Sequence, residues 1–283
     1  MDIPCESNPM SDLTWTTPVM RAGYAGRGLT YLSIAGLSLY AIWRGGEAKG
    51  TGSTMESLST SLWGLAVLWL IAVGLMAYAV WCIINAWADL DAEGSEASSL
   101  VKRVGQAIKG AIYLALAGLA ATAALGVEGS GAGIPGLVST VLGWPGGWLL
   151  VALVGFGFAG AGLAEISRGV RATYRKHLAA NPFTTHWDWA LRVGLIAQGV
   201  SITLIGSLFL YAAWTGRAGE TGGVDTVFEF LDEQTFGNAM VVATCLGFLA
   251  FAFYCFVNAA YRVIPKVADV GMETLAAKLK AMA

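Results

Sequence analysis

The chain repeats one two-helix pattern three times, and this repeat constrains the fold more than any single residue does. Each copy holds a long apolar segment, a loop and a second long apolar segment. The first segment of each copy opens with Arg-x-Gly, and a polar residue and a second glycine follow four and five residues after the first glycine. This eight-residue pattern occupies residues 21–28, 103–110 and 192–199. The pattern predicts an all-helical fold built by triplication of one helical hairpin.

The apolar segments are long enough to cross a membrane. A helix needs roughly 20 mostly apolar residues to span the hydrocarbon core. Apolar residues make up 56% of the chain and charged residues 13%, whereas soluble domains hold about 25% charged residues. We therefore expect an all-α membrane protein with six transmembrane helices and short amphipathic surface helices. The predicted spans are about 22–43, 62–86, 107–127, 147–167, 193–214 and 238–261.

These spans divide the chain into five parts. Residues 1–18 contain three prolines and three acids but no apolar core, so they predict a disordered cytoplasmic tail without a cleavable signal peptide. The three repeats, each with two transmembrane helices, occupy 19–90, 100–178 and 189–265. Residues 266–283 have helical apolar spacing and two lysines, which predicts an amphipathic cytoplasmic tail.

Basic residues are distributed asymmetrically between the loops. When the loops are assigned alternately to two sides, all but three of the 17 lysines and arginines lie on one side; the exceptions are Arg44, Lys49 and Arg217. Basic loops stay on the cytoplasmic side of a membrane. We therefore expect a multi-pass membrane protein with both termini in the cytoplasm. Its basic face is expected to contact anionic lipids of the bilayer.

Small residues and short amphipathic stretches recur in the copies. Glycines in the opening pattern, and again at Gly36, Gly118 and Gly206, are expected to let helices approach closely. The second helices carry central glycines at Gly74, Gly155 and Gly247, with the same expectation. Before each second helix, residues near 55–62, 137–142 and 227–231 have helical apolar spacing, which predicts helices lying flat on the outer side.

The Arg-x-Gly opening, the apolar residue and glycine that start each second helix, and the triplication together resemble the DUF1206 family of six-span bacterial membrane proteins. The resemblance covers roughly residues 19–265. It implies the fold and a location in the bacterial inner membrane, but no catalytic residues, because the function of the family is unknown. Two positions depart from the repeat. Ile166 stands where the other copies have Asn85 and Asn258, and Gln198 stands where the others have a lysine or arginine. Three hairpins with both termini on one side further predict a pseudo-threefold axis along the membrane normal.

Polar residues in or beside the spans are the candidate functional positions. They are Arg21, Arg27, Arg103, Lys109, Arg192, Gln198, Asn85, Glu165 and Asn258. The equivalent residues Arg27, Lys109 and Gln198 either ring the axis as a site for an anion or lipid headgroup, or extend to lipid phosphates at the surface; we favour the second interpretation. The two asparagines and Glu165 either hydrogen-bond between helices, which we favour, or face one another near the cytoplasmic mouth. Expected ion-pair partners of Glu165 are Arg168, Arg21 and Arg103.

No residue pattern indicates an enzyme. His177 and His186 lie near Asp188 without the compact spacing of a metal site, so we expect no metal, no cofactor and no nucleic-acid partner. Two functions remain. We favour a non-catalytic accessory, scaffold or lipid-interacting component that packs against other membrane-protein subunits. The alternative is a carrier or channel for a small solute or ion on the pseudo-threefold axis, which requires polar residues of the three copies to converge inward.

Overall fold

The computed structural model describes residues 15–88, 90, 97–126, 133–264 and 275. Within these ranges the fold consists of helices and loops, with one isolated β-bridge between Leu178 and Arg262. The long helices are α1 (Thr16–Trp43), α3 (Leu62–Ala88), α4 (Ala97–Ala124), α6 (Gly147–Val170), α8 (Asp188–Thr215) and α10 (Gly237–Tyr261). The short ones are α2 (Thr51–Ser59), α5 (Gly133–Leu142), η2 (Thr173–His177), α7 (Pro182–His186), η3 (Ala218–Glu220) and α9 (Val224–Asp232).

All six predicted long helices and the three predicted short ones are present, with shifted boundaries. Helix α1 begins at Thr16, inside the predicted tail 1–18, because Thr16 and Met20 are fully buried in the packed end of the fold. Helix α4 begins at Ala97, ten residues before the predicted start. The rest of the predicted tail, and the predicted helix at 266–283 except Leu275, lie outside the described residues. Leu275 is buried, and its N–H donates to the Leu178 carbonyl oxygen at 2.8 Å.

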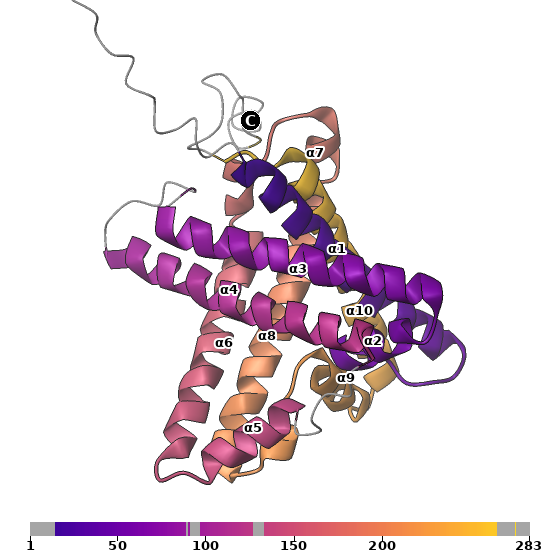
Figure 1. The fold of residues 1–283 in the computed structure, drawn as a ribbon, viewed down its shortest axis with the longest axis vertical. Coiled ribbons are helices and arrows are strands. Elements are labelled where there is room, and N and C mark those ends of the chain that lie inside the picture. Colours follow the sequence, from indigo (N-terminus) through magenta and orange to yellow (C-terminus); the bar gives the residue numbers. More distant parts are fainter. Residues whose placement is uncertain (1–14, 89, 91–96, 127–132, 265–274, 276–283) are drawn as a thin grey trace, which may run out of the picture.

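The long helices pack in one continuous series, α4–α3–α1–α10–α8–α6. Each second helix packs on the first helix of the next copy, since α3 contacts α4, α6 contacts α8, and α10 contacts α1. The first and third copies also pack internally, through α1–α3 and α8–α10. In Figure 1 the α3–α4 pair crosses the α6–α8 pair. Helices α1 and α10 therefore occupy the middle of the series, and α4 and α6 are its ends.

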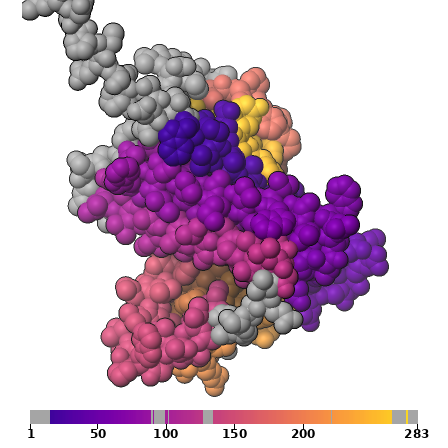
Figure 2. Space-filling model, viewed as in Figure 1, coloured from indigo at the N-terminus to yellow at the C-terminus, as the bar shows by residue number. Residues whose placement is uncertain are grey.

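The middle copy is open, because α4 and α6 do not pack along their lengths. Only 17% and 22% of their most apolar stretches are buried, against 50% for α3 and α10. In Figure 2 the surface is hollowed between the magenta atoms of α4 and the pink atoms of α6, and orange atoms from the third copy are visible at the floor. One of the three hairpins is thus splayed, whereas the other two are closed.

Glycines bring α6 and α8 into close contact, as predicted for Gly155 and Gly206. A Cβ atom on Gly206 would lie 2.8 Å from the Gly155 carbonyl oxygen. A Cβ on Gly162 would lie 2.6 Å from the carbonyl oxygen of Gly199, which is closer than real Cβ contacts. The same prediction is wrong for Gly36, Gly105 and Gly118, whose Cβ positions have no described atom within 4 Å, because these positions do not face a neighbouring helix.

Five of the long helices are long and apolar enough to cross a membrane: α3, α6, α8, α10 and residues 102–124 of α4. Among the described residues α1 does not meet this criterion, since it carries Arg21 and Arg27 together with many small and polar residues. The exposed apolar helices are compatible with a multi-pass membrane protein. We call the end where α1, α4 and α8 begin the basic end, after Arg21, Arg103 and Arg171. The other is the acidic end, after exposed Glu47, Glu56 and Glu233. Exposed tryptophans lie at both, including Trp43, Trp63 and Trp214 at the acidic end and Trp87 and Trp189 at the basic end.

Candidate functional site

Arg27 lies inside the protein and is only 8% exposed. Its Nη1 donates a hydrogen bond to the Tyr78 hydroxyl at 3.0 Å. Its Cζ lies 5.1 Å from the ring centroids of Tyr78 and Tyr113 and 4.7 Å from that of Phe251. These residues come from α3, α4 and α10, so three helices surround a guanidinium that belongs to α1. We call these three residues the aromatic box.

The guanidinium has no direct ion-pair partner in the described part of the chain. No described carboxylate forms an ion pair with Arg27, and its Nε is buried without a hydrogen-bond partner. Each cation–π contact contributes about 0.5–2 kcal/mol. Burying an ion costs several kcal/mol even after relaxation. The aromatic box therefore offsets part of the desolvation cost of Arg27, but no described carboxylate contacts the guanidinium directly.

Gln198 brings the third copy to the same place. It is 3% exposed, and its Nε2 donates to the Tyr31 hydroxyl at 2.6 Å. Tyr31 lies one helical turn after Arg27 on α1, and its ring meets the Phe251 ring edge-to-face with centroids 4.8 Å apart. The Gln198 Oε1 is buried and has no partner among the described residues. Gln198 and Arg27 are thus connected through Tyr31 and Phe251, and we call these residues, with the rest of the aromatic box, the cluster. Its unsatisfied polar atoms are Arg27 Nε and Gln198 Oε1.

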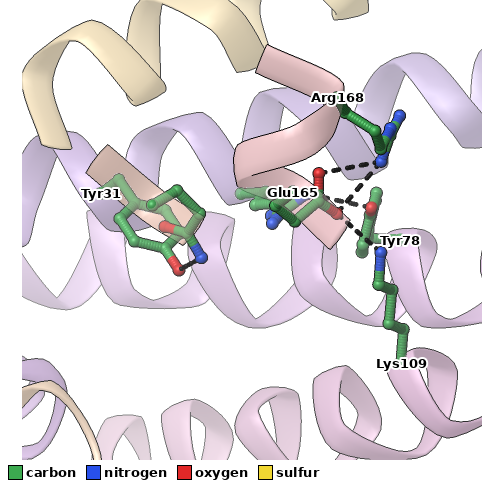
Figure 3. Close-up of polar contacts among 7 residues, drawn as sticks. Tyr31, Tyr78, Lys109, Glu165 and Arg168 are labelled. Carbon is green, nitrogen blue, oxygen red and sulfur yellow. Dashed lines mark hydrogen bonds and ion pairs between the residues drawn. The ribbon is translucent and has the colours of Figure 1, made fainter. Parts of the chain in front are cut away.

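Glu165 binds two cations at the edge of this cluster. Its carboxylate accepts from Lys109 Nζ at 2.8 Å and from Arg168 Nη1 at 2.9 and 3.0 Å, and the two cations reach it from different sides (Figure 3). Glu165 is 5% exposed, whereas the side chains of Lys109 and Arg168 are 33% and 37% exposed. Because Lys109 belongs to α4 and Glu165 to α6, this ion pair joins the two helices of the open middle copy.

The three equivalent positions of the repeat are therefore directed inward. Arg27 sits in the aromatic box, Gln198 bonds to Tyr31, and Lys109 pairs with Glu165, which also lies within the electrostatic range of Arg27. The interpretation that they extend to lipid phosphates does not hold for Arg27 and Gln198. Both are buried because α1 and α8 meet other helices on those faces. Counting Arg27, Lys109 and Arg168 against Glu165, the cluster carries two net positive charges.

The remaining candidates lie apart from Arg27 or have other partners. Arg103 donates to the carbonyl oxygens of Ala86 and Trp87 at 2.7 and 2.8 Å, so it caps the C-terminus of α3. Asn258 is 1% exposed, and its Nδ2 donates to the Tyr254 carbonyl oxygen at 2.8 Å. The others are Asn85, which is buried, Arg21, which is exposed, and Arg192, which is half-buried. Of the expected partners of Glu165, the structure brings Arg168 to it, and it adds Lys109.

None of the three residues of the aromatic box was among the predicted positions. Tyr78 and Phe251 each follow the central glycine of a second helix by four residues, after Gly74 and Gly247. The middle copy has Ala159 at this place. The repeat therefore contained the signal, but aromatic residues in apolar helices are so common that it could not be separated from ordinary packing.

A folded connection covers the basic end between α6 and α8. Tyr174 donates to Asp188 Oδ1 at 2.7 Å, and Arg175 Nε donates to the same atom at 2.8 Å. Burial, followed by the hydrogen bond to Asp188, raises the pKa of the Tyr174 phenol. Asp188, which is near His177 and His186 in the sequence, is thus hydrogen-bonded to Tyr174 and Arg175. Within the described ranges no three His, Cys, Asp or Glu side chains are grouped to hold a metal ion.

Comparison with known proteins supports the threefold repeat. Residues 22–89, 104–172 and 193–262 each match the family described as "Domain of Unknown Function (DUF1206)". The uncharacterized protein YxxB of Bacillus subtilis (strain 168) is 25% identical to this chain over 252 residues, which cover 88% of the chain and 92% of that protein. No solved structure matches the chain. Since the three matches cover most of the sequence, the chain belongs to the DUF1206 family and contains three copies of its repeat.

Proposed function

We propose that the protein is a non-catalytic membrane carrier that binds a small anion beside Arg27. The supporting observation is a buried guanidinium that has no described carboxylate partner and lies among residues from all three copies. A bound anion would supply the missing counter-charge in a region where electrostatic attraction is strong. The two net positive charges of the cluster, and the unsatisfied Arg27 Nε, favour an anion over a cation or a neutral solute.

The proposed carrier spans the bacterial inner membrane six times. Helix α1, with 28 residues, is about 42 Å long at 1.5 Å per residue, which exceeds the hydrocarbon thickness of about 30 Å. Its polar residues Arg27, Thr30 and Ser38 are buried in the fold, so they do not prevent it from being the sixth span. The positive-inside rule places the basic end and both termini in the cytoplasm, where anionic lipids meet the exposed basic residues.

The helix series also supports a pseudo-threefold arrangement. Its three inter-copy contacts are of one kind, and the series would close into a ring if α4 and α6 met. The open place between these helices is the proposed route by which an anion reaches Arg27. The Lys109–Glu165 ion pair crosses this route, so an incoming anion would compete with Glu165 for Lys109 and loosen the connection between α4 and α6.

A role as an accessory or scaffold subunit is a second candidate. It is favoured by the outward faces of α4 and α6, on which Leu119, Leu153 and Phe156 are 47%, 69% and 66% exposed. In a membrane such a face contacts acyl chains or the helices of another subunit. Native mass spectrometry of the gently extracted protein separates the two roles, because an accessory subunit would carry a partner in fixed stoichiometry.

The carrier proposal is tested with the purified full chain in liposomes. Vesicles loaded with the potassium salt of one anion and treated with valinomycin lose K⁺ only as fast as the anion can accompany it. We expect protein-dependent efflux with at least one of chloride, phosphate, sulfate and acetate, and a loss of about tenfold in R27Q, as expected when a charge-assisted hydrogen bond is removed. Exposed Arg44, which lies over the Tyr40 ring, provides the control R44Q. If no anion produces protein-dependent efflux and none changes the thermal stability of the protein, the proposal is refuted.

A further inference from the structure

We infer that the anion bound beside Arg27 is a small carboxylate, held through both of its oxygens on the side-on edge of the guanidinium. This inference rests on the proposed anion function and specifies its substrate class. It depends on which nitrogen atoms of Arg27 are engaged by the protein and which are not.

A guanidinium offers two edges with paired N–H groups. One edge consists of Nη1 and Nη2, and the other, the side-on edge, consists of Nε and Nη2. Arg27 uses Nη1 for its hydrogen bond to the Tyr78 hydroxyl. On the side-on edge, Nε is buried without a partner, and no hydrogen bond from Nη2 to a described residue is present. The edge left unused by the protein is therefore one to which a carboxylate binds with two parallel hydrogen bonds.

The surroundings restrict what can reach this edge. The rings of Tyr78, Tyr113 and Phe251 lie within 5.1 Å of Cζ, so the guanidinium is held in place by aromatic contacts. Its orientation is thus fixed before a ligand arrives, which lowers the entropy cost of binding. A ligand with two oxygens matches a fixed planar pair of donors, whereas a spherical chloride offers one acceptor atom. A planar carboxylate also fits beside a guanidinium that aromatic rings surround.

Gln198 supplies a second unsatisfied polar group in the same cluster. It bonds to Tyr31, which is one helical turn from Arg27, and its remaining amide oxygen is buried and unpaired. A hydroxyl or amino group on the carbon next to the carboxylate would be the natural donor to this oxygen. We therefore expect lactate, which has such a hydroxyl, to bind more tightly than propionate, which has the same length without it.

The test is thermal unfolding of the full chain in lipid nanodiscs, with sodium acetate, propionate, lactate, sulfate and chloride compared at equal ionic strength. The expected result is a saturable rise in melting temperature with the three carboxylates, largest with lactate. In R27K, which keeps the charge but loses the planar edge, carboxylate affinity should fall at least about tenfold. In Q198L the advantage of lactate over propionate should disappear while acetate still binds.

Three results would overturn the inference, and they separate its failure from that of the proposed function. If sulfate or chloride stabilises the wild-type protein as strongly as acetate does, the site takes anions in general, and the carrier proposal stands without the carboxylate assignment. If R27K binds acetate as well as the wild type, the side-on edge is not the binding group. If no anion stabilises the wild-type protein, both proposals fail, and this measurement does not depend on any variant folding.

Discussion

Replacing Glu165 with glutamine should destabilise the protein, because this carboxylate forms ion pairs with two cations and joins α4 to α6. Its oxygens lie 2.8 Å from Lys109 Nζ and 2.9 Å from Arg168 Nη1, and the residue is 5% exposed. Removing one partner of a buried ion pair costs about 3–5 kcal/mol. Here Lys109 and Arg168 are about one-third exposed, so water and lipid headgroups recover part of that cost.

We therefore expect E165Q to lower the free energy of unfolding by about 2 kcal/mol. For a domain of this size, 1 kcal/mol corresponds to a change in melting temperature of roughly 2–4 °C, so the expected decrease is about 4–8 °C. The variant K109M should lose less, about 1 kcal/mol, because Glu165 keeps its two hydrogen bonds to Arg168. The double variant should lose less than the sum of the two single effects, since both remove the same ion pair.

The assay is thermal unfolding in nanodiscs, followed by tryptophan fluorescence. The matched control is E229Q, because Glu229 is exposed and forms no ion pair in the described part of the structure. Its melting temperature should stay within about 1 °C of that of the wild type, as for most exposed positions. If E165Q behaves like E229Q, the ion pair does not hold α4 to α6 and the reasoning is wrong.

Three further predictions concern helix packing, capping and orientation. G162A should lower the free energy of unfolding by about 1–3 kcal/mol, because the new methyl group would lie 2.6 Å from the Gly199 carbonyl oxygen. The control G157A, whose methyl group would meet nothing within 4 Å, should not lower it. Equal melting temperatures of the two variants would contradict the close contact. D225A should lower the free energy of unfolding by about 1–2 kcal/mol, because the Asp225 carboxylate accepts hydrogen bonds from Gly52 N, Ser53 N and Ser53 Oγ at the start of α2. The control is D232A, since Asp232 is exposed. Unfolding of the two variants in guanidinium or urea would show the difference. In a background with Cys5 replaced by serine, a membrane-impermeant maleimide should label E47C but not R171C in intact cells, both positions being exposed; the opposite pattern would reverse the proposed orientation.

Much of the fold could be predicted, because helix positions depend on local apolar periodicity. The starts of α3 and α6 and the ends of α1 and α10 coincide with the predicted residues. The order in which the helices pack could not be predicted, since in lipid it depends on shape rather than on apolar burial. Gly36, Gly105 and Gly118 illustrate this: the sequence contains them at repeated positions, but only the packing decides which glycines meet another helix.

The polar members of the candidate site were predictable, but its aromatic members and its arrangement were not. The repeat aligned Arg27 with Lys109 and Gln198, and it identified Glu165 as an exception. Whether a basic residue near a helix end faces lipid or protein depends on its rotation about the helix axis, which a nearly uniform apolar helix does not encode. The burial of Arg27 follows from the central position of α1 in the helix series, which only the tertiary structure gives.

Glu165, which only the middle copy has at its position in the repeat, shows what joining three repeats in one polypeptide allows. At the position of Glu165 the first and third copies have Ile84 and Val257, so a trimer of identical hairpins could not reproduce this arrangement. Such a trimer would carry the acid three times or not at all, and it would open at all three hairpins or at none. Covalent linkage lets one repeat diverge alone, so that two hairpins keep a rigid frame while the third becomes free to acquire a moving part.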